Sequence, residues 1–246
     1  MTASAPSTHG PHFFCEPDAV DGVSVTLRGE EARHLARVLR AVRGDPVSLA
    51  DGTGMLYQAR VADARPDRVR CRIHDRYEIP PPRPRLSVVH ALPKGRKLDE
   101  VVQRLSEVGV DRLVPVHSAR SQVRLHGDKA TRAVDRWRSV ALAAAKQARR
   151  VRLLDVAPVG EWDTAFADAT GAVLWEQADV GLPAVLAELG PAGDLVLAVG
   201  PEGGLTGEEV TAAGLPAARL GPTILRTETA ALVAASVAMA AVGRLG

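Results

Sequence analysis

The sequence predicts an α/β protein in which a domain built on a parallel sheet follows a smaller, β-rich domain. Strand-like and helix-like segments alternate from residue 86 to the end, which is typical of a parallel sheet covered by helices. Before residue 79, strand-like segments instead alternate apolar and polar residues with a period of two. Between the two regions, residues 79–85 contain four prolines and predict an extended linker. We therefore expect domains at residues 1–78 and 86–246.

The first domain contains three strand-like segments and one helix. Residues 23–27, 47–49 and 68–74 predict strands, and the last of these alternates strictly between apolar and charged side chains. A glycine-containing turn at residues 51–54 follows the second strand, and a helix is expected at about residues 30–40. A small β-barrel or sandwich would bury the apolar faces of these strands.

The second domain predicts five strands and five helices in alternation. The expected strands are 86–92, 113–116, 172–175, 195–199 and 218–220, and the expected helices are 97–108, 129–150, 183–189, 208–213 and 227–242. In open parallel sheets, ligands bind in a crevice beyond the carboxyl ends of the strands. We therefore search for functional residues in the turns that follow these strands.

The sequence lacks the features of membrane, secreted and metal-binding proteins. The longest charge-free apolar run, between Glu228 and Arg244, is too short and too rich in alanine to span a bilayer. The N-terminus has no basic cluster followed by an apolar core, so we expect no signal peptide. Cys15 and Cys71 are isolated, without the spacing of a zinc site. We expect a cytoplasmic protein with reduced thiols, no membrane association and no metal.

Positive charge is concentrated in the middle of the chain, although the net charge is only +2. Residues 86–155 hold 15 Lys or Arg against 7 acidic residues, a balance of +8. Residues 156–246 hold 3 Arg against 11 acidic residues, a balance of −8. A basic region of this kind indicates a polyanionic partner such as nucleic acid. Pairing of these charges across the fold would explain the composition equally well.

The most informative segment is residues 195–209, with the sequence LVLAVGPEGGLTGEE. A buried strand leads into a glycine-rich turn, and Thr206 and Glu209 have the spacing of a capping box at the start of a helix. Glycines in such a turn allow the backbone to approach a ligand closely. The turn has neither the Gly-Lys-Ser/Thr of a phosphate loop nor the glycine spacing of a dinucleotide-binding turn, which argues against a nucleotide hydrolase.

A second turn, at residues 219–231, has the sequence RLGPTILRTETAA. Thr227 is placed to cap the following helix, and Glu228 suits the positive end of its dipole. Arg226 does not fit this explanation, because a cation is disfavoured at a helix N-terminus. We therefore predict a functional role for Arg226, with Glu228 beside it.

These two segments resemble the signature sequences of the RsmE-type 16S rRNA uracil-N3 methyltransferases. VGPEGGLTGEE and LGPTILRTETAALVA match them in order. Residues 92–118, LPKGRKLDEVVQRLSEVGVDRLVPVHS, are similar to the family's first strand–helix–strand unit. Residues 34–54 and the pair Phe13-Phe14 are similar to its N-terminal barrel. The resemblance extends over nearly the whole chain.

The resemblance implies a PUA-like RNA-binding β-barrel followed by a SPOUT domain with a trefoil-knotted parallel sheet. It also implies a homodimer that uses S-adenosylmethionine as methyl donor and acts on ribosomal RNA or the small ribosomal subunit. The cofactor would be held mainly by the glycine turns. The residues that match the family's cofactor site are Trp175, Val199, Gly200, Gly203, Leu220, Gly221, Ile224, Leu225 and Ala230.

The basic residues suggest where RNA binds. Those expected to contact it are Arg33, His34, Arg37, Arg40, Lys94, Lys146 and Arg150. A charged helix face without a partner remains the alternative for the first four and for Lys146 and Arg150. Residues 144–150, AAKQARR, depart from the family's A-x-E-Q-S-x-R pattern, since Lys146 replaces an acidic residue and Ala148 replaces Ser.

The implied reaction is transfer of a methyl group to N3 of a uridine. Arg226 would stabilise the uracil anion through O2 or O4. Glu228 would either accept the N3 proton or orient Arg226, and we favour the orienting role because an ordinary carboxylate is a weak base for this proton. Two alternatives remain: a SPOUT methyltransferase acting on a ribose 2′-hydroxyl or a tRNA base, and an RNA-binding protein of the same fold without activity.

Overall fold

The structure, a computed structural model, describes residues 10–190 and 193–245. The chain forms two compact units. The first comprises Met1–Pro81 together with Ala145–Leu153, and the second comprises Pro82–Ala144 and Leu154–Gly246. The ends of the two expected domains at residues 1–9 and 246 lie outside the described residues.

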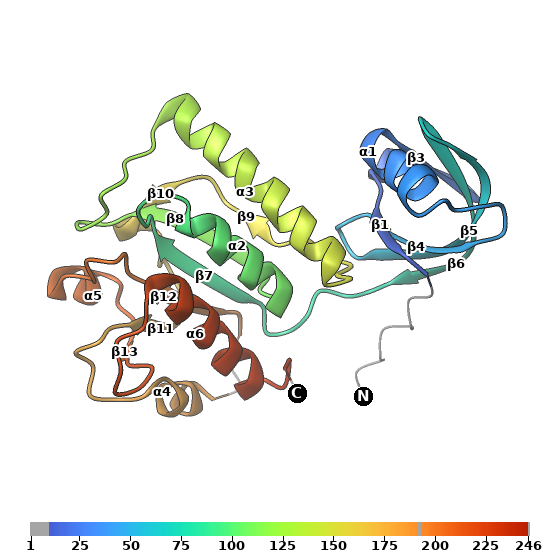
Figure 1. The fold of residues 1–246 in the computed structure, drawn as a ribbon. Coiled ribbons are helices and arrows are strands. Elements are labelled where there is room, and N and C mark those ends of the chain that lie inside the picture. Colours follow the sequence, from blue (N-terminus) through green and yellow to red (C-terminus); the bar gives the residue numbers. More distant parts are fainter. Residues whose placement is uncertain (1–9, 191–192, 246) are drawn as a thin grey trace. The chain divides into compact units, whose positions relative to one another are not determined.

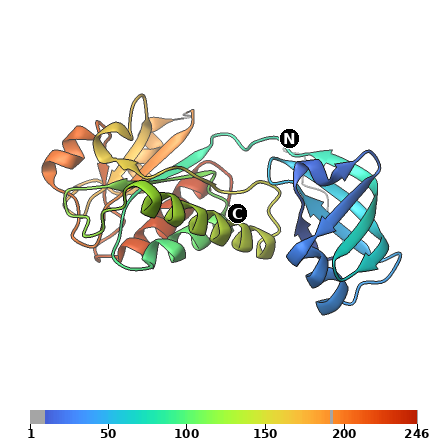
Figure 2. The same ribbon diagram turned by 90° about the horizontal axis from the view of Figure 1, so that it is seen from above.

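The first unit is a mixed six-stranded sheet in the order β1-β4-β5-β6-β3-β2. Its strands are coloured from blue to teal in Figure 2. Its strands are β1 (His12–Phe14), β2 (Val20–Asp21), β3 (Ser24–Arg28), β4 (Pro46–Ala50), β5 (Met55–Arg65) and β6 (Arg68–Glu78). Its short helical segments are η1 (Pro17–Ala19), α1 (Gly29–Arg33) and η2 (His34–Val38). In β6 buried residues alternate with exposed ones up to Ile73, which confirms the predicted amphipathic strand.

The segment Ala145–Leu153 packs on the first unit, although the sequence placed it within the second domain. His12 Nε2 lies 3.0 Å from the carbonyl oxygen of Arg150, and the Leu153 N–H donates to the Gly52 carbonyl at 3.0 Å. The Arg152 guanidinium donates to the Ile79 carbonyl at 2.7 Å. The sequence assigned this segment to the other domain because the bonds join residues far apart in the sequence, and a periodic pattern reports only on local structure.

The second unit has a parallel sheet in the order β10-β8-β7-β12-β11-β13, with β9 also paired to β8. Its strands are β7 (Leu86–Ala91), β8 (Arg112–His117), β9 (Asp155–Val156), β10 (Gly160–Glu161), β11 (Thr170–Leu174), β12 (Leu195–Val199) and β13 (Ala217–Ala218). Four of the five predicted strands are confirmed, the fifth, predicted at 218–220, occurs as β13 at Ala217–Ala218, and β9 and β10 were not predicted.

Helices cover both faces of this sheet (Figure 1). They are α2 (Lys97–Val108), α3 (Gly127–Gln147), η3 (Trp162–Thr164), α4 (Leu182–Leu189), α5 (Gly207–Ala212) and α6 (Thr227–Ala241). The main apolar core lies between one face and α2, α3, α4 and α6, and a smaller core lies beneath α5 and η3. The helix predicted for 129–150 ends at Gln147, and Arg149 follows with a left-handed φ of 53°. Within the described residues, no helix is long and apolar enough to cross a membrane.

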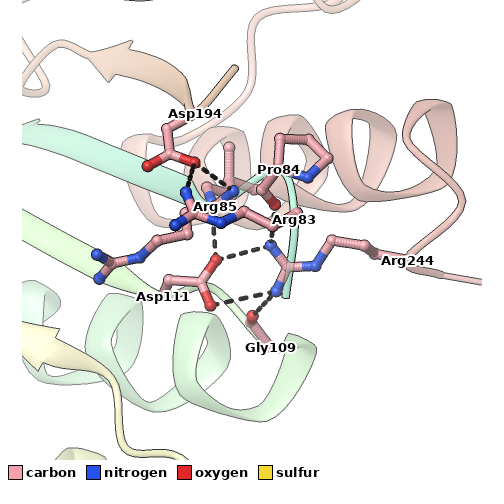
Figure 3. Close-up of polar contacts among 8 residues, drawn as sticks. Arg83, Pro84, Arg85, Gly109, Asp111, Asp194 and Arg244 are labelled. Atoms are coloured by element: carbon pink, nitrogen blue, oxygen red, sulfur yellow. Dashed lines mark hydrogen bonds and ion pairs between the residues drawn. The ribbon is translucent and has the colours of Figure 1, made fainter. Parts of the chain in front are cut away.

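An ion pair fixes the end of α6 against the start of the sheet, as Figure 3 shows. The Arg244 guanidinium donates to Asp111 Oδ2 at 2.7 Å and to the carbonyls of Pro84 and Gly109 at 2.9 and 2.8 Å. Asp111 Oδ2 also accepts the Leu86 N–H at 2.8 Å. The Arg244 and Asp111 side chains are only 11% and 7% exposed. Each buried charge is therefore stabilised by its counterion in the other side chain.

A second carboxylate, Asp194, binds the residues that directly precede β7. It accepts bonds from the Arg85 N–H and from Arg83 Nη1, both at 3.0 Å. The Arg85 bond is the main cause that lowers the pKa of Asp194. The Arg83–Asp194 pair is largely solvent-exposed, with side chains 70% and 47% exposed. The two pairs therefore share one region but differ in burial.

Replacing Arg244 with alanine should destabilise the protein strongly, because the Asp111 charge would remain buried without its counterion. We expect the free energy of unfolding to fall by about 3–5 kcal/mol. Arg83→Ala breaks the exposed pair and should cost less than about 1 kcal/mol. Urea denaturation followed by circular dichroism compares the two variants. Equal losses in both would contradict the role assigned to the buried pair.

Candidate active site

A cleft of about 490 Å³ lies beyond the carboxyl ends of β11 and β12. Its walls come from three turns, those that follow β11, β12 and β13, and from the starts of α2 and α6. All nine residues predicted to hold the cofactor line it: Trp175, Val199, Gly200, Gly203, Leu220, Gly221, Ile224, Leu225 and Ala230. The predicted position of the crevice at this edge of the sheet is thereby confirmed.

The first glycine turn is held at its far end by the predicted capping box. The Thr206 hydroxyl accepts the Glu209 N–H at 3.1 Å, and Glu209 Oε2 accepts the Thr206 N–H at 2.9 Å. Glu209 Oε1 also accepts the Ala119 N–H at 2.6 Å. This buried carboxylate therefore fastens the loop that follows β8 to the first glycine turn.

Glycine is required in the first turn chiefly by packing within the protein. A Cβ at Gly203 would lie 3.2 Å from Cβ of Arg120, and a Cβ at Gly200 would lie 2.9 Å from Cγ of Leu205. Arg120 Nη1 donates to the Gly203 carbonyl at 3.0 Å. Packing against Arg120 and Leu205 adds to the predicted reason for these glycines, which is close approach of the backbone to a ligand. In the second turn, a Cβ at Gly221 would meet nothing within 4 Å.

A buried hydroxyl joins the two glycine turns. Thr227 Oγ1 donates to the Gly200 carbonyl at 2.6 Å and lies 3.2 Å from His90 Nε2. His90 is fully buried at the end of β7, with Nδ1 2.7 Å from the Ala91 carbonyl oxygen. Burial lowers the pKa of His90, so its ring is neutral near pH 7. Thr227 therefore does not cap α6 as the sequence suggested, and Arg226 occupies the cap position.

Arg226 and Glu228 lie at the start of α6 in different surroundings. Arg226 is exposed and lines the cleft. Glu228 is only 7% exposed and is not among the lining residues. Glu228 Oε2 has no hydrogen-bond partner, and no hydrogen bond or ion pair joins Glu228 to Arg226, within the described residues. A direct bond that orients Arg226 is therefore absent from this part of the structure.

Lys97, which was not predicted as a site residue, also lines the cleft. Its Nζ lies 2.8 Å from Glu202 Oε1 in the first glycine turn, and Glu202 also accepts the Lys94 N–H at 3.1 Å. The bond to Glu202 raises the pKa of Lys97. Burial acts to raise the pKa of Glu202, but the hydrogen bonds that it accepts outweigh this effect and lower that pKa. Both groups are therefore ionised near pH 7.

The cleft has the properties of a small-molecule site. Its volume lies within the range of roughly 300–1,000 Å³ usual for such sites, and its walls combine apolar side chains with charged ones. Trp175 Nε1 is buried and finds no acceptor among the residues that the structure describes. The Trp175 ring also packs against the smaller apolar core, the alternative role that its sequence position allowed. No cluster of side chains suited to a metal ion occurs in the described ranges.

The predicted RNA-binding residues lie on both units. Arg33, His34, Arg37 and Arg40 are exposed along α1, η2 and the residues that follow. The Lys146 ammonium pairs with Glu31 within the first unit, which also contains Arg150. Lys94 is exposed in the turn between β7 and α2 of the second unit.

Comparison with protein families covers most of the chain. Residues 80–239 match the family model of an RNA methyltransferase domain. Residues 27–73 match that of an RNA methyltransferase PUA domain. The expected PUA domain is therefore confirmed within the first unit, and the methyltransferase domain coincides with the sheet that bears the cleft.

Individual proteins agree with these matches. The ribosomal RNA small subunit methyltransferase E of Mycobacterium bovis is 36% identical over 244 residues, covering 95% of this chain and 91% of that protein. The protein of that name from Bacillus subtilis is 31% identical, covering 86% and 88%. A crystal structure of the Neisseria gonorrhoeae protein of that name, bound to S-adenosyl methionine, is 28% identical with a TM-score of 0.82, covering 94% of this chain and 98% of that chain. The chain belongs to the ribosomal RNA small subunit methyltransferase E family.

Proposed function

We propose that this chain, an S-adenosylmethionine-dependent rRNA methyltransferase by family, methylates N3 of a uridine in 16S ribosomal RNA. The observation that supports the proposal most directly is the position of Arg226, a cation at the rim of a cleft formed by both glycine turns. A cation at that point suits a reaction in which the substrate base becomes negatively charged. Digestion of RNA methylated in vitro, with mass spectrometry of its nucleosides, tests the proposal. A methylated ribose or another methylated base would contradict it.

The cleft fits the proposed cofactor. S-adenosylmethionine supplies a methyl group on a positively charged sulfur, which requires no metal and no covalent bond to the enzyme. The apolar side chains of Leu220, Ile224 and Leu225 are suited to its adenine ring, and the open space at Gly221 allows close backbone approach. These residues would bind and orient the methyl donor.

Arg226 is proposed to favour loss of the N3 proton. N3 lies between two carbonyl groups, so its anion shares negative charge with O2 and O4. A guanidinium donor beside one of these oxygens stabilises that charge as it develops. A paired base offers its N3 poorly, so the target uridine must be unpaired or turned out of its helix.

Glu228 is proposed to support the cations at the start of α6 rather than to accept the proton. Its carboxylate does not line the cleft, which makes direct contact with a base there difficult. It contributes to the electrostatic surroundings of Lys97 and of His90. A negative charge in this position would hold positively charged side chains at the rim.

The remaining features of the family are proposed for this chain as well. We infer that residues 1–78 form the RNA-binding barrel, that residues 79–85 link it to residues 86–246, and that the second sheet is a trefoil knot. The bonds of Arg120 and Glu209, which hold the loop after β8 on the turn after β12, support the knot. A cytoplasmic homodimer that acts on the small ribosomal subunit is the proposed working form. RNA contacts are proposed for Arg33, His34, Arg37, Arg40, Lys94, Lys146 and Arg150.

Filling the cleft from a helix should weaken cofactor binding without straining the backbone. Ala230 lines the cleft from α6, so Ala230→Leu should weaken S-adenosylmethionine binding at least about tenfold, as a lost 1.4 kcal/mol would. Ala240→Leu adds the same side chain at an exposed position of α6 and serves as the control. Isothermal titration calorimetry measures both. Unchanged binding by folded Ala230→Leu would place the cofactor elsewhere.

Arg226 and Glu228 should contribute unequally to the rate. Arg226→Ala should slow single-turnover methylation roughly a hundredfold, as removal of one stabilising donor typically does, and Arg226→Lys should retain part of the rate. Glu228→Gln should cost less, and adding it to Arg226→Ala should slow the reaction by no more than Glu228→Gln does alone, because Arg226 is one of the cations that Glu228 supports. If Glu228→Gln were instead nearly inactive at pH 7 and recovered in alkali, Glu228 would be the proton acceptor.

The exposed arginines of the first unit should contribute to RNA affinity through phosphate contacts. Arg37→Ala combined with Arg40→Ala should reduce the slope of log affinity against log salt by about two units, about one for each lost contact. Arg65→Ala with Arg68→Ala removes two exposed arginines near the β5–β6 turn, where each lies close to Asp63. Filter binding over a range of salt gives the slopes. Equal slopes for the two double variants would argue against the proposed surface.

A further inference from the structure

We propose that Lys97 is a second catalytic cation, whose ammonium donates to one of the two carbonyl oxygens flanking N3 while Arg226 serves the other. The inference rests on the proposed function and adds a residue to it. It begins from the position of Lys97, which lines the same cleft as Arg226.

The two cations reach the cleft from adjacent elements. Lys97 is the first residue of α2, just beyond the carboxyl end of β7, and Arg226 is the cap residue of α6. The helices α2 and α6 pack together on one face of the sheet (Figure 1). The strand β7 is hydrogen-bonded to β12, whose carboxyl end leads into the first glycine turn. Two helix starts therefore bring positive charge to one cleft from two directions.

The Lys97 ammonium is held in place before any substrate arrives. Glu202 accepts one of its three N–H donors at 2.8 Å, which leaves two for a ligand. Glu202 is fixed in turn by the Lys94 N–H at 3.1 Å. The side chain of Lys97 remains 37% exposed, so its ammonium is accessible. A donor fixed in this way stabilises developing charge with little reorganisation.

The charged groups around Lys97 agree with a catalytic role. Glu202, Glu228 and Arg226 are the charged groups that influence it, and the bond to Glu202 raises the pKa of Lys97, so the ammonium stays charged over the working pH range. The cleft is lined by the cations Lys97, Arg219 and Arg226 and by the carboxylates Glu176 and Glu202, so its charges nearly balance. When the uracil anion forms, both cations have a new acceptor.

The chemistry requires no further reactant. The N3 proton leaves to solvent, and the N3 electron pair forms the bond to the methyl carbon. The bond between that carbon and sulfur breaks with its electrons remaining on sulfur, which becomes a neutral thioether. Uracil offers one oxygen on each side of N3, and two donors on opposite sides would hold N3 in line with the methyl group.

A different ligand chemistry is possible for a lysine in this position, because S-adenosylmethionine has a carboxylate of its own. The two assignments predict different kinetics. A lysine that binds the cofactor carboxylate changes cofactor affinity, and saturating cofactor restores its rate. A lysine that stabilises the uracil anion changes the rate at saturation and leaves cofactor affinity alone.

The test compares Lys97→Met with Arg104→Met. Arg104 lies two turns further along α2, is 38% exposed and is paired with Glu100, so it matches Lys97 in exposure and pairing but not in reaching the cleft. Calorimetry gives cofactor affinity, and single-turnover methylation at saturating cofactor and RNA gives the rate. For Lys97→Met we expect a rate loss of about tenfold to a hundredfold, with cofactor affinity within about twofold of wild type. Arg104→Met should match wild type in both.

Two further measurements make the outcome decisive. The rate deficit of Lys97→Met should shrink as pH rises, because the substrate is then already ionised, and Lys97→Gln repeats the test if the methionine variant misfolds. A wild-type rate for a folded Lys97 variant, or a deficit removed by more cofactor, would overturn the inference. The nucleoside that the wild-type protein methylates shows whether the role of Lys97 or the proposed N3 methylation is wrong. N3-methyluridine from wild type together with a fast Lys97 variant refutes only the role of Lys97.

Discussion

The bond from the Thr227 hydroxyl to the Gly200 carbonyl is the interaction on which the active site depends. It joins the first glycine turn to the start of α6, and it rests on His90, a fully buried side chain at the end of β7. Three segments far apart in the sequence therefore meet at one hydroxyl group. Because Arg226 directly precedes Thr227, the same bond also sets where the proposed catalytic cation emerges.

Other contacts extend this constraint to the rest of the cleft. Glu209 and Arg120 fasten the loop after β8 to the first glycine turn, and Glu202 fastens the start of α2 to it. At the opposite end of α6, Arg244 is anchored to Asp111 near the start of the sheet. A helix fixed at both ends presents its first turn to the ligand with little freedom, which is what transfer between two positioned reactants requires.

The sequence predicted the parallel sheet and the position of the cleft, because the two glycine turns follow buried strands, and the nine residues implied by the family resemblance line that cleft. It did not predict Lys97 or His90, whose roles arise from partners more than 100 residues away. It also did not predict that Gly203 lies against Arg120, from a loop that periodicity cannot place. The attachment of Ala145–Leu153 to the first unit was missed for the same reason. The local sequence pattern indicated the glycine turns, whereas the long-range contacts that position them are visible only in the folded chain.

The protein is proposed to methylate N3 of a uridine in 16S ribosomal RNA, with the methyl donor bound in this cleft. The most direct measurement maps modified nucleotides in 16S RNA from a strain lacking the gene, complemented with wild type or with Arg226→Ala. We expect one N3-methyluridine to be absent from the deletion strain, to be restored by the wild-type protein and to be largely missing with Arg226→Ala. An unchanged N3-methyluridine content in the deletion strain, or loss of a different modification, would contradict it.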